Sequence, residues 1–211
     1  LYIAFTKIGF FDVYFTFRGS MGAKLLKFAV KAKKKYQFNY KNYPNCHQVE
    51  KYVDFINHSL SSHYPAGNLT NYFNKSKNIK KVRSLGINPG ASYGSAKRWY
   101  PEKFAKIAIA LSDNFDIIIF GGVGEKDFAQ QIEKFLLKKN IYNYQNLAGK
   151  TTISELNNYI SNLDIFVTGD SGPMHLAASL QIPTIAIFGP TNSNETSQWK
   201  NSNSVIIKKN L

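Results

Sequence analysis

The sequence has little cysteine and no long apolar run, which argues against a disulfide-bonded, secreted or membrane-spanning protein. Cys46 is the single cysteine among 211 residues, so no intrachain disulfide can form, and no charged-then-apolar signal sequence opens the chain. Its apolar runs, such as the one around Asp116 to Phe120, fall far short of the roughly 18 residues of a membrane-spanning helix. We therefore expect a cytoplasmic protein without a transmembrane segment.

Acidic residues and arginine are also scarce. Lysine and arginine together number 27 against 13 aspartates and glutamates, a formal net charge of +14, and the arginines are Arg18, Arg83 and Arg98. This charge suggests an anionic partner, although a solvated lysine-rich surface explains it equally well. A basic nucleic-acid-binding module is one reading, because KFAVKAKKKYQFNYKNY interleaves lysines with aromatics. Base recognition commonly uses the bidentate fork of arginine, so we expect no nucleic-acid partner.

The first part of the chain predicts an incomplete α/β domain. It begins with Leu1 in an already apolar segment, which suggests a piece of a longer protein or a processed chain. The apolar patterns predict strands at 11–17 and 36–38 and helices at 23–34 and 48–60. A polar, lysine-rich stretch with Pro65 and Gly67 then predicts a linker at 65–84, between a partial N-terminal domain at 1–64 and a C-terminal domain at 85–211.

The rest of the chain alternates regularly between strands and helices. The patterns predict strands at 84–88, 116–120, 165–168 and 184–188, and helices at 101–111, 125–139, 153–162 and 173–180. This alternation requires parallel strands joined by right-handed crossovers, and hence a doubly wound sheet. Ligands of such sheets lie beyond the carboxyl ends of the strands. We therefore expect the loops NPGASYGSAKRW, GGVGEKD and GDSGPMH to meet at one rim.

The third of these loops has the composition of a helix start that binds an anion. Pro173 suits the first turn of a helix, so Ser171 or its neighbour should cap a helix whose free N–H groups face the rim. Pyrophosphate is the ligand that we expect there, with Ser171 and Gly172 facing the phosphates and Asp170 turned to sugar hydroxyls. An ordinary capped helix would carry the same short motif, and His175 and Lys97 alone also fit a core histidine and a surface lysine. The loops match neither a Walker A motif nor a dinucleotide fingerprint, which argues against an NAD-dependent oxidoreductase.

Together, the order and spacing of the motifs resemble a known family. NPGASYGSAKRWYPEKFAKIA, FGGVGEKDFAQQI and the segment from NLAGKTT to TSQW resemble the C-terminal domain of bacterial lipopolysaccharide heptosyltransferases of glycosyltransferase family 9, nearest to the heptosyltransferase II branch. The resemblance is strong over residues 84–199 and thinner over residues 1–62.

The resemblance implies an α/β fold of the GT-B type, with a doubly wound, Rossmann-like C-terminal domain and a partial N-terminal Rossmann-like domain. It implies inverting transfer of L-glycero-D-manno-heptose from ADP-heptose to the inner core of lipopolysaccharide or lipooligosaccharide. No metal or other cofactor is expected, because a cation and helix-end amides can stabilise the departing ADP. The implied setting is the cytoplasm, in peripheral contact with the inner membrane.

The same resemblance assigns roles to individual residues. Lys97 and Asp170 are the catalytic candidates, Lys97 offsetting charge on the departing ADP and Asp170 holding heptose hydroxyls. The other donor-binding candidates are Ser92 at the phosphates or sugar, Glu125 at the ribose, Gly149, Lys150 and Thr151 beside the adenine, Ser171 and Gly172 at the pyrophosphate, and His175 in support of that loop.

One motif of the family has no counterpart in this sequence. The family carries a Gly-Asp pair early in its N-terminal domain, and the resemblance makes that aspartate the general base for the acceptor hydroxyl. We therefore expect this chain to bind ADP-heptose better than it turns it over. A catalytically inactive ADP-sugar-binding fragment is the alternative.

Overall fold

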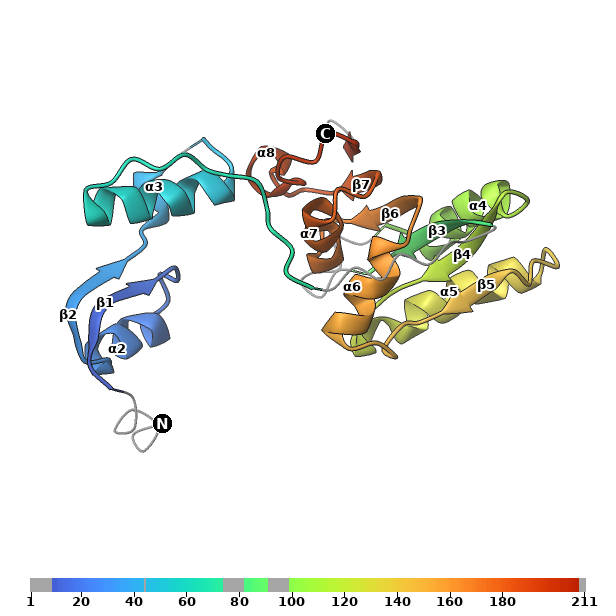
Figure 1. Ribbon diagram of the computed structural model, residues 1–211. Coiled ribbons are helices and arrows are strands. Elements are labelled where there is room, and N and C mark those ends of the chain that lie inside the picture. The colour runs from blue at the N-terminus through green and yellow to red at the C-terminus, as the bar shows by residue number, and fades with distance from the viewer. Residues whose placement is uncertain (1–8, 44, 74–81, 91–98, 209–211) are drawn as a thin grey trace. The chain divides into compact units, whose positions relative to one another are not determined.

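The computed structural model describes residues 9–43, 45–73, 82–90 and 99–208 (Figure 1). The chain divides into two compact units, Leu1–Gly67 and Asn68–Leu211, and this division lies within the segment predicted as a linker. Asn71 belongs to the second unit, because its side-chain amide donates to Asn157 Oδ1 at 2.8 Å and to Ser179 Oγ at 3.0 Å.

The first unit is a small parallel β-α-β arrangement followed by a helix. Strand β1 (Phe11–Thr16) pairs in parallel with β2 (Ala32–Gln37), and helix α2 (Met21–Ala29) connects them. A 3-10 turn, η1 (Tyr40–Asn42), precedes α3 (Gln48–Leu60), whose bounds match the prediction. Aromatic rings from β1 and the residue after it, from α3 and from the segment after β2 pack together, namely Phe15, Phe17, Phe38, Tyr43, Tyr52 and Phe55.

The helix predicted at 23–34 is wrong in its second half. Helix α2 ends at Ala29, and the lysines after Lys31 lie in β2, where Lys34 pairs with Val13 of β1. Lysine favours helix over strand by a few tenths of a kcal/mol. The backbone ladder of a parallel strand pair outweighs so small a preference, and the sequence alone does not reveal that ladder.

The second unit is built on one parallel sheet. Within the described residues this sheet has six strands: β3 (Arg83–Asn88), β4 (Phe115–Ile119), β5 (Tyr144–Asn146), β6 (Ile165–Gly169), β7 (Thr184–Phe188) and β8 (Ser204–Lys208). Their spatial order is β5-β4-β3-β6-β7-β8. The order reverses between β3 and β6, and in open α/β sheets a ligand crevice lies beyond the strand ends at such a reversal.

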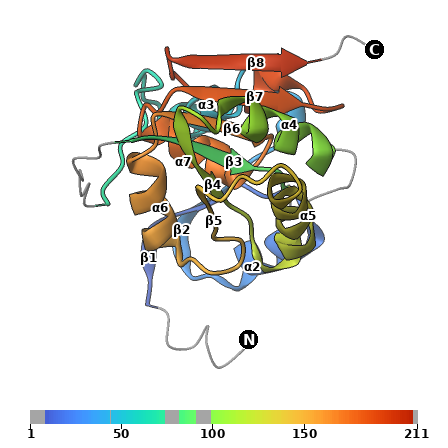
Figure 2. The same cartoon turned by 90° about the vertical axis from the view of Figure 1, so that its right-hand side faces the viewer.

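Helices cover both faces of this sheet, as Figure 2 shows. Helices α4 (Pro101–Leu111) and α5 (Lys126–Leu137) pack on one face, against a cluster that includes Leu85 and Ile117. Helices α6 (Ile153–Ser161) and α7 (Gly172–Ser179) cover the other, against a cluster that includes Ile118 and Phe166. Alternate residues of β4 therefore enter opposite halves of the core, which is the predicted doubly wound arrangement.

Four further elements in the described part of the second unit were not predicted. They are η3 (Val123–Glu125), α8 (Ser193–Thr196) and the outer strands β5 and β8. Strand β5 has three residues and no apolar alternation, so periodicity cannot reveal it. Among the described helices, none combines the length and apolar composition that crossing a lipid bilayer requires.

Candidate functional site

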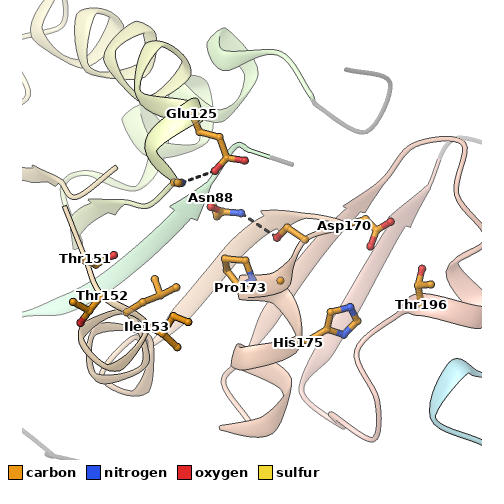
Figure 3. A pocket seen from close by; sticks show the side chains of 14 residues that line it. Asn88, Glu125, Thr151, Thr152, Ile153, Asp170, Pro173, His175 and Thr196 are labelled. Atoms are coloured by element: carbon orange, nitrogen blue, oxygen red, sulfur yellow. Dashed lines mark hydrogen bonds between the residues drawn. The ribbon is translucent and has the colours of Figure 1, made fainter. Parts of the chain in front are cut away.

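A cavity of about 490 Å³ opens at the carboxyl ends of the strands in the second unit (Figure 3). Its lining comes from Asn88, the last residue of β3, and from the segments that follow β4, β5, β6 and β7. Two of the three predicted rim loops, GGVGEKD and GDSGPMH, therefore meet there, and residues 91–98 of the first loop lie outside the described residues. The lining residues are Asn88, Gly121, Gly122, Glu125, Thr151, Thr152, Ile153, Leu156, Asp170, Ser171, Gly172, Pro173, His175 and Thr196.

A hydrogen-bond network joins the ends of β3 and β6 at the floor of this cavity. Asn88 is 1% exposed, and its Nδ2 donates to Ser171 Oγ at 3.0 Å and to Thr168 Oγ1 at 3.2 Å. The two hydroxyl oxygens lie 3.1 Å apart, and Thr168 Oγ1 also donates to the carbonyl of Gly169 at 3.0 Å. The network fixes the loop after β6 relative to the strand at which the sheet order reverses.

This network changes how helix α7 begins. Ser171 is the N-cap residue, as predicted, but its side chain makes no capping hydrogen bond to the helix. The hydroxyl is held by Asn88 instead, and Pro173 has no N–H to offer. The N–H of Met174 donates to the carbonyl of Ser171 at 3.2 Å. In the first turn of the helix, Pro173 has no N–H to donate and Gly172 has no side chain. The missing side chain lets an anion approach the helix end.

Glu125 borders the cavity on one side of that helix start. It is 7% exposed, and its Oε2 accepts a hydrogen bond of 2.6 Å from the backbone N–H of Gly122. Gly90 lies directly beneath it, since a Cβ at Gly90 would overlap the carboxylate of Glu125. The absence of a side chain at position 90 therefore makes room for this buried carboxylate.

Asp170 borders the cavity on the other side. It is also 7% exposed, and its Oδ2 accepts a hydrogen bond of 2.9 Å from the hydroxyl of Thr191. In Figure 3 the first turn of α7, marked by Pro173, lies between Glu125 and Asp170, and His175 lies on the Asp170 side. His175 is an exposed residue of the first turn of α7.

The segment after β5 forms the remaining wall, with Thr151 in the lining. Gly149 has a φ of +67°, which favours glycine, and its N–H donates to the carbonyl of Gly121 at 2.8 Å, so it ties this wall to the loop after β4. Lys150 is exposed, and its Nζ donates to the carbonyl of Asn146 at 2.9 Å. Gly149 and Lys150 lie beside the cavity but do not line it.

The charged side chains among the described lining residues are all acidic. Glu125 and Asp170 are acidic, and no lysine or arginine is among these residues. Within the described part of the chain, no group of three histidine, cysteine, aspartate or glutamate side chains is placed to hold a metal ion. An anion at the start of α7 would therefore lie between two carboxylates and depend on backbone and hydroxyl donors and on any cation nearby.

Six of the predicted site residues thus line one cavity: Glu125, Thr151, Asp170, Ser171, Gly172 and His175. Ser92 and Lys97 lie outside the described residues. Sequence reasoning missed Asn88, Thr152, Ile153, Leu156, Thr191 and Thr196. Asn88 carried a usable signal, because it is a polar residue at the end of an otherwise apolar strand. Thr191 carried none, because its contact with Asp170 depends on how β6 and β7 lie in the sheet.

The comparisons with known proteins agree with this fold. Residues 27–211 match the profile of glycosyltransferase family 9 (heptosyltransferase). Lipooligosaccharide heptosyltransferase 2 of Campylobacter jejuni is 41% identical over 213 residues, which cover 97% of this chain and 66% of that protein. The chain therefore spans just under two thirds of the length of this relative.

Solved structures show the same fold. The structure of E. coli ADP-heptose lipopolysaccharide heptosyltransferase II superposes with a TM-score of 0.77 at 22% identity, covering 93% of this chain and 68% of that one. A family 9 glycosyltransferase from Veillonella parvula gives a TM-score of 0.79 at 16% identity, covering 99% and 65%. The predicted α/β fold of the GT-B type is confirmed. The match over residues 27–211 shows that the chain belongs to glycosyltransferase family 9, the heptosyltransferase family.

Proposed function

We propose that the cavity is the donor site of an inverting heptosyltransferase. The enzyme would transfer L-glycero-D-manno-heptose from ADP-heptose to the inner core of lipopolysaccharide or lipooligosaccharide. The observation that carries the proposal is the start of α7, which opens onto the cavity between two buried carboxylates. A nucleotide sugar has the matching order of parts, because its anionic diphosphate lies between two hydroxyl-bearing sugars.

The donor would lie across the cavity with its ribose at Glu125 and its heptose at Asp170. Carboxylates accept hydrogen bonds from hydroxyls and repel phosphates, so Glu125 suits the ribose and Asp170 the heptose. The diphosphate then rests at Gly172 and Ser171, where the helix dipole favours negative charge. Thr151 and the wall after β5 lie on the Glu125 side in Figure 3 and would border the adenine.

Charge on the departing ADP needs stabilisation during transfer. We assign this role to Lys97, which follows β3 in the sequence, with Ser92 as a further contact to the phosphates or sugar, and we propose that no metal ion takes part. A positioned cation and helix-end amides stabilise the negative charge of a leaving group, as a divalent metal ion does in other transferases. The support for this assignment is the family match, together with the end of β3 at Asn88, which lines the cavity.

The acceptor is part of a lipid-anchored molecule, so we also propose peripheral contact with the cytoplasmic face of the inner membrane. The net charge of +14 and helix α2 support this, because Leu25 is 66% and Phe28 88% exposed on a helix that also exposes Lys24. Such a helix can combine apolar burial with attraction to anionic lipid. Co-sedimentation with phosphatidylglycerol vesicles, and not with phosphatidylcholine vesicles, is expected, and equal binding to both or to neither contradicts this part.

Thermal unfolding of the chain with nucleotides tests the donor site. ADP and ADP-heptose should both raise the melting temperature in EDTA, because a ligand that binds only the native state stabilises it by about 2.7 kcal/mol at 100 times its Kd. A rise that appears only with Mg²⁺ refutes the metal-free site, and no rise with either nucleotide refutes the donor site. An assay of heptose transfer to heptose-deficient lipopolysaccharide then separates an active enzyme from a fragment that only binds ADP-sugar.

A further inference from the structure

Thr191 connects two parts of the second unit that are 21 positions apart in the sequence. It lies between β7 and α8, and its hydroxyl donates to Asp170 Oδ2 at 2.9 Å. Asp170 follows β6, so the bond ties the rim of one strand to the rim of its neighbour in the sheet.

The backbone that carries Thr191 is itself held in place. Nζ of Lys208, the last residue of β8, donates to the carbonyl of Thr191 at 3.1 Å. The next residue, Asn192, caps α8, because its Oδ1 accepts from the N–H of Asn194 at 3.2 Å and its Nδ2 donates to Glu195 Oε1 at 2.9 Å. Thr191 therefore contacts Asp170 from a segment fixed on both sides.

The carboxylate of Asp170 needs such a donor. Only 7% of the residue is exposed, and a buried carboxylate is costly unless hydrogen bonds compensate for lost water. A hydroxyl donor to an ionised carboxylate makes a charge-assisted bond, which is stronger and shorter than a neutral one. One such bond occupies one of about four acceptor positions on the two oxygens, and it also restricts rotation of the carboxylate plane.

We propose that Thr191 is a positioning residue that orients Asp170 toward the sugar of the bound nucleotide sugar. The inference rests on the proposed function, which places the sugar at Asp170. In that arrangement the effect of Thr191 is confined to the sugar end of the donor, because the diphosphate and adenosine lie toward α7 and Glu125. Loss of the Thr191 hydroxyl should therefore weaken binding of ADP-heptose and leave binding of ADP unchanged.

Calorimetric titration of ADP and of ADP-heptose into the chain and its variants tests this. Thr191→Val keeps the shape and removes the donor, so its affinity for ADP-heptose should fall about tenfold while its affinity for ADP stays the same. Thr191→Ser keeps the hydroxyl and should restore binding. Thr70→Val, at an exposed position outside the cavity, is the matched control and should bind both ligands normally.

Two other binding results for the folded Thr191→Val variant would overturn the inference. Equal losses for ADP and ADP-heptose in Thr191→Val would show a general structural effect, and no loss for either would show that Asp170 is oriented without Thr191. If Thr191→Val does not fold, Thr191→Ala is compared with Thr191→Ser by the same criterion. If the unaltered chain binds neither ligand, the donor site itself is refuted and the role of Thr191 falls with it.

Discussion

Asn88 Nδ2 donates a hydrogen bond of 3.0 Å to Ser171 Oγ across 83 positions of the sequence. The bond joins the ends of β3 and β6, the two strands between which the sheet order reverses. It also draws the Ser171 hydroxyl away from the cap of α7, so the geometry of the proposed anion site depends on a residue of another strand.

Asn88→Asp should weaken ADP binding strongly. The variant keeps the size of the side chain, but it loses the donor to Ser171 and Thr168 and adds a negative charge beneath the diphosphate. Loss of a hydrogen bond to a buried group costs about 1–3 kcal/mol, so the affinity for ADP should fall by a factor of between about five and about 150. Asn203→Asp, at an exposed position before β8, is the control for charge, and equal titration curves for the two variants would contradict this role of Asn88.

Gly90→Ala should destabilise the second unit, because the new Cβ overlaps the Glu125 carboxylate. Forcing an extra methyl group into a packed site typically costs about 1–3 kcal/mol of unfolding free energy. Gly124→Ala is the matched control, since a Cβ there meets nothing within 4 Å. In chemical denaturation, Glu125→Ala should relieve the cost in the double variant. Additive effects of Gly90→Ala and Glu125→Ala would show that the two residues do not interact.

Lys97→Ala tests whether a specific cation supports the diphosphate. Removing a charge-assisted contact costs about 1.5–3 kcal/mol, so ADP affinity should fall by about one to two orders of magnitude while the far-UV circular dichroism is unchanged. Lys138→Ala, at the exposed end of α5, should have no effect. If both variants lose affinity equally, only the diffuse positive charge of the chain attracts ADP.

The contribution of the start of α6, which borders the cavity, to folding stability should fall in acid. Hydrogen bonds from the backbone N–H and the hydroxyl of Thr152, at 2.8 and 2.9 Å, hold the pKa of Glu155 below its ordinary value. Its ionised form therefore favours the folded state, and this contribution is complete above the ordinary pKa and is lost as the pH falls through the lowered one. The stability difference between the chain and Glu155→Gln should shrink over that range. An NMR titration that places the Glu155 pKa at or above its ordinary value would contradict this.

Local signals in the sequence predicted much of the second unit. Pro101 at the first position of α4 and the β-branched run of β7 gave both elements their observed bounds, because start signals and apolar runs act locally. The meeting of the loops GGVGEKD and GDSGPMH at the rim followed from strand–helix alternation, since parallel strands bring their carboxyl ends to one edge.

Contacts between distant residues could not be predicted in this way. The lysines of β2 favour helix when considered alone, and they form a strand because β1 lies beside them. The hydroxyl of Ser171 looked like a helix cap, and only the position of Asn88 on the neighbouring strand reveals its actual partner. The same holds for Thr191 and Asp170, so the sequence predicted the parts of the site but not the bonds that orient them.

An NMR titration of the backbone amides with ADP in EDTA tests the donor site most directly. We expect saturable shifts that are largest for Gly172, Met174 and Gly122 around the cavity, and that persist when the salt concentration is raised. Shifts concentrated on the lysines of β2, falling away with added salt, would show that ADP binds to diffuse positive charge and not at the start of α7, and would contradict the proposed site.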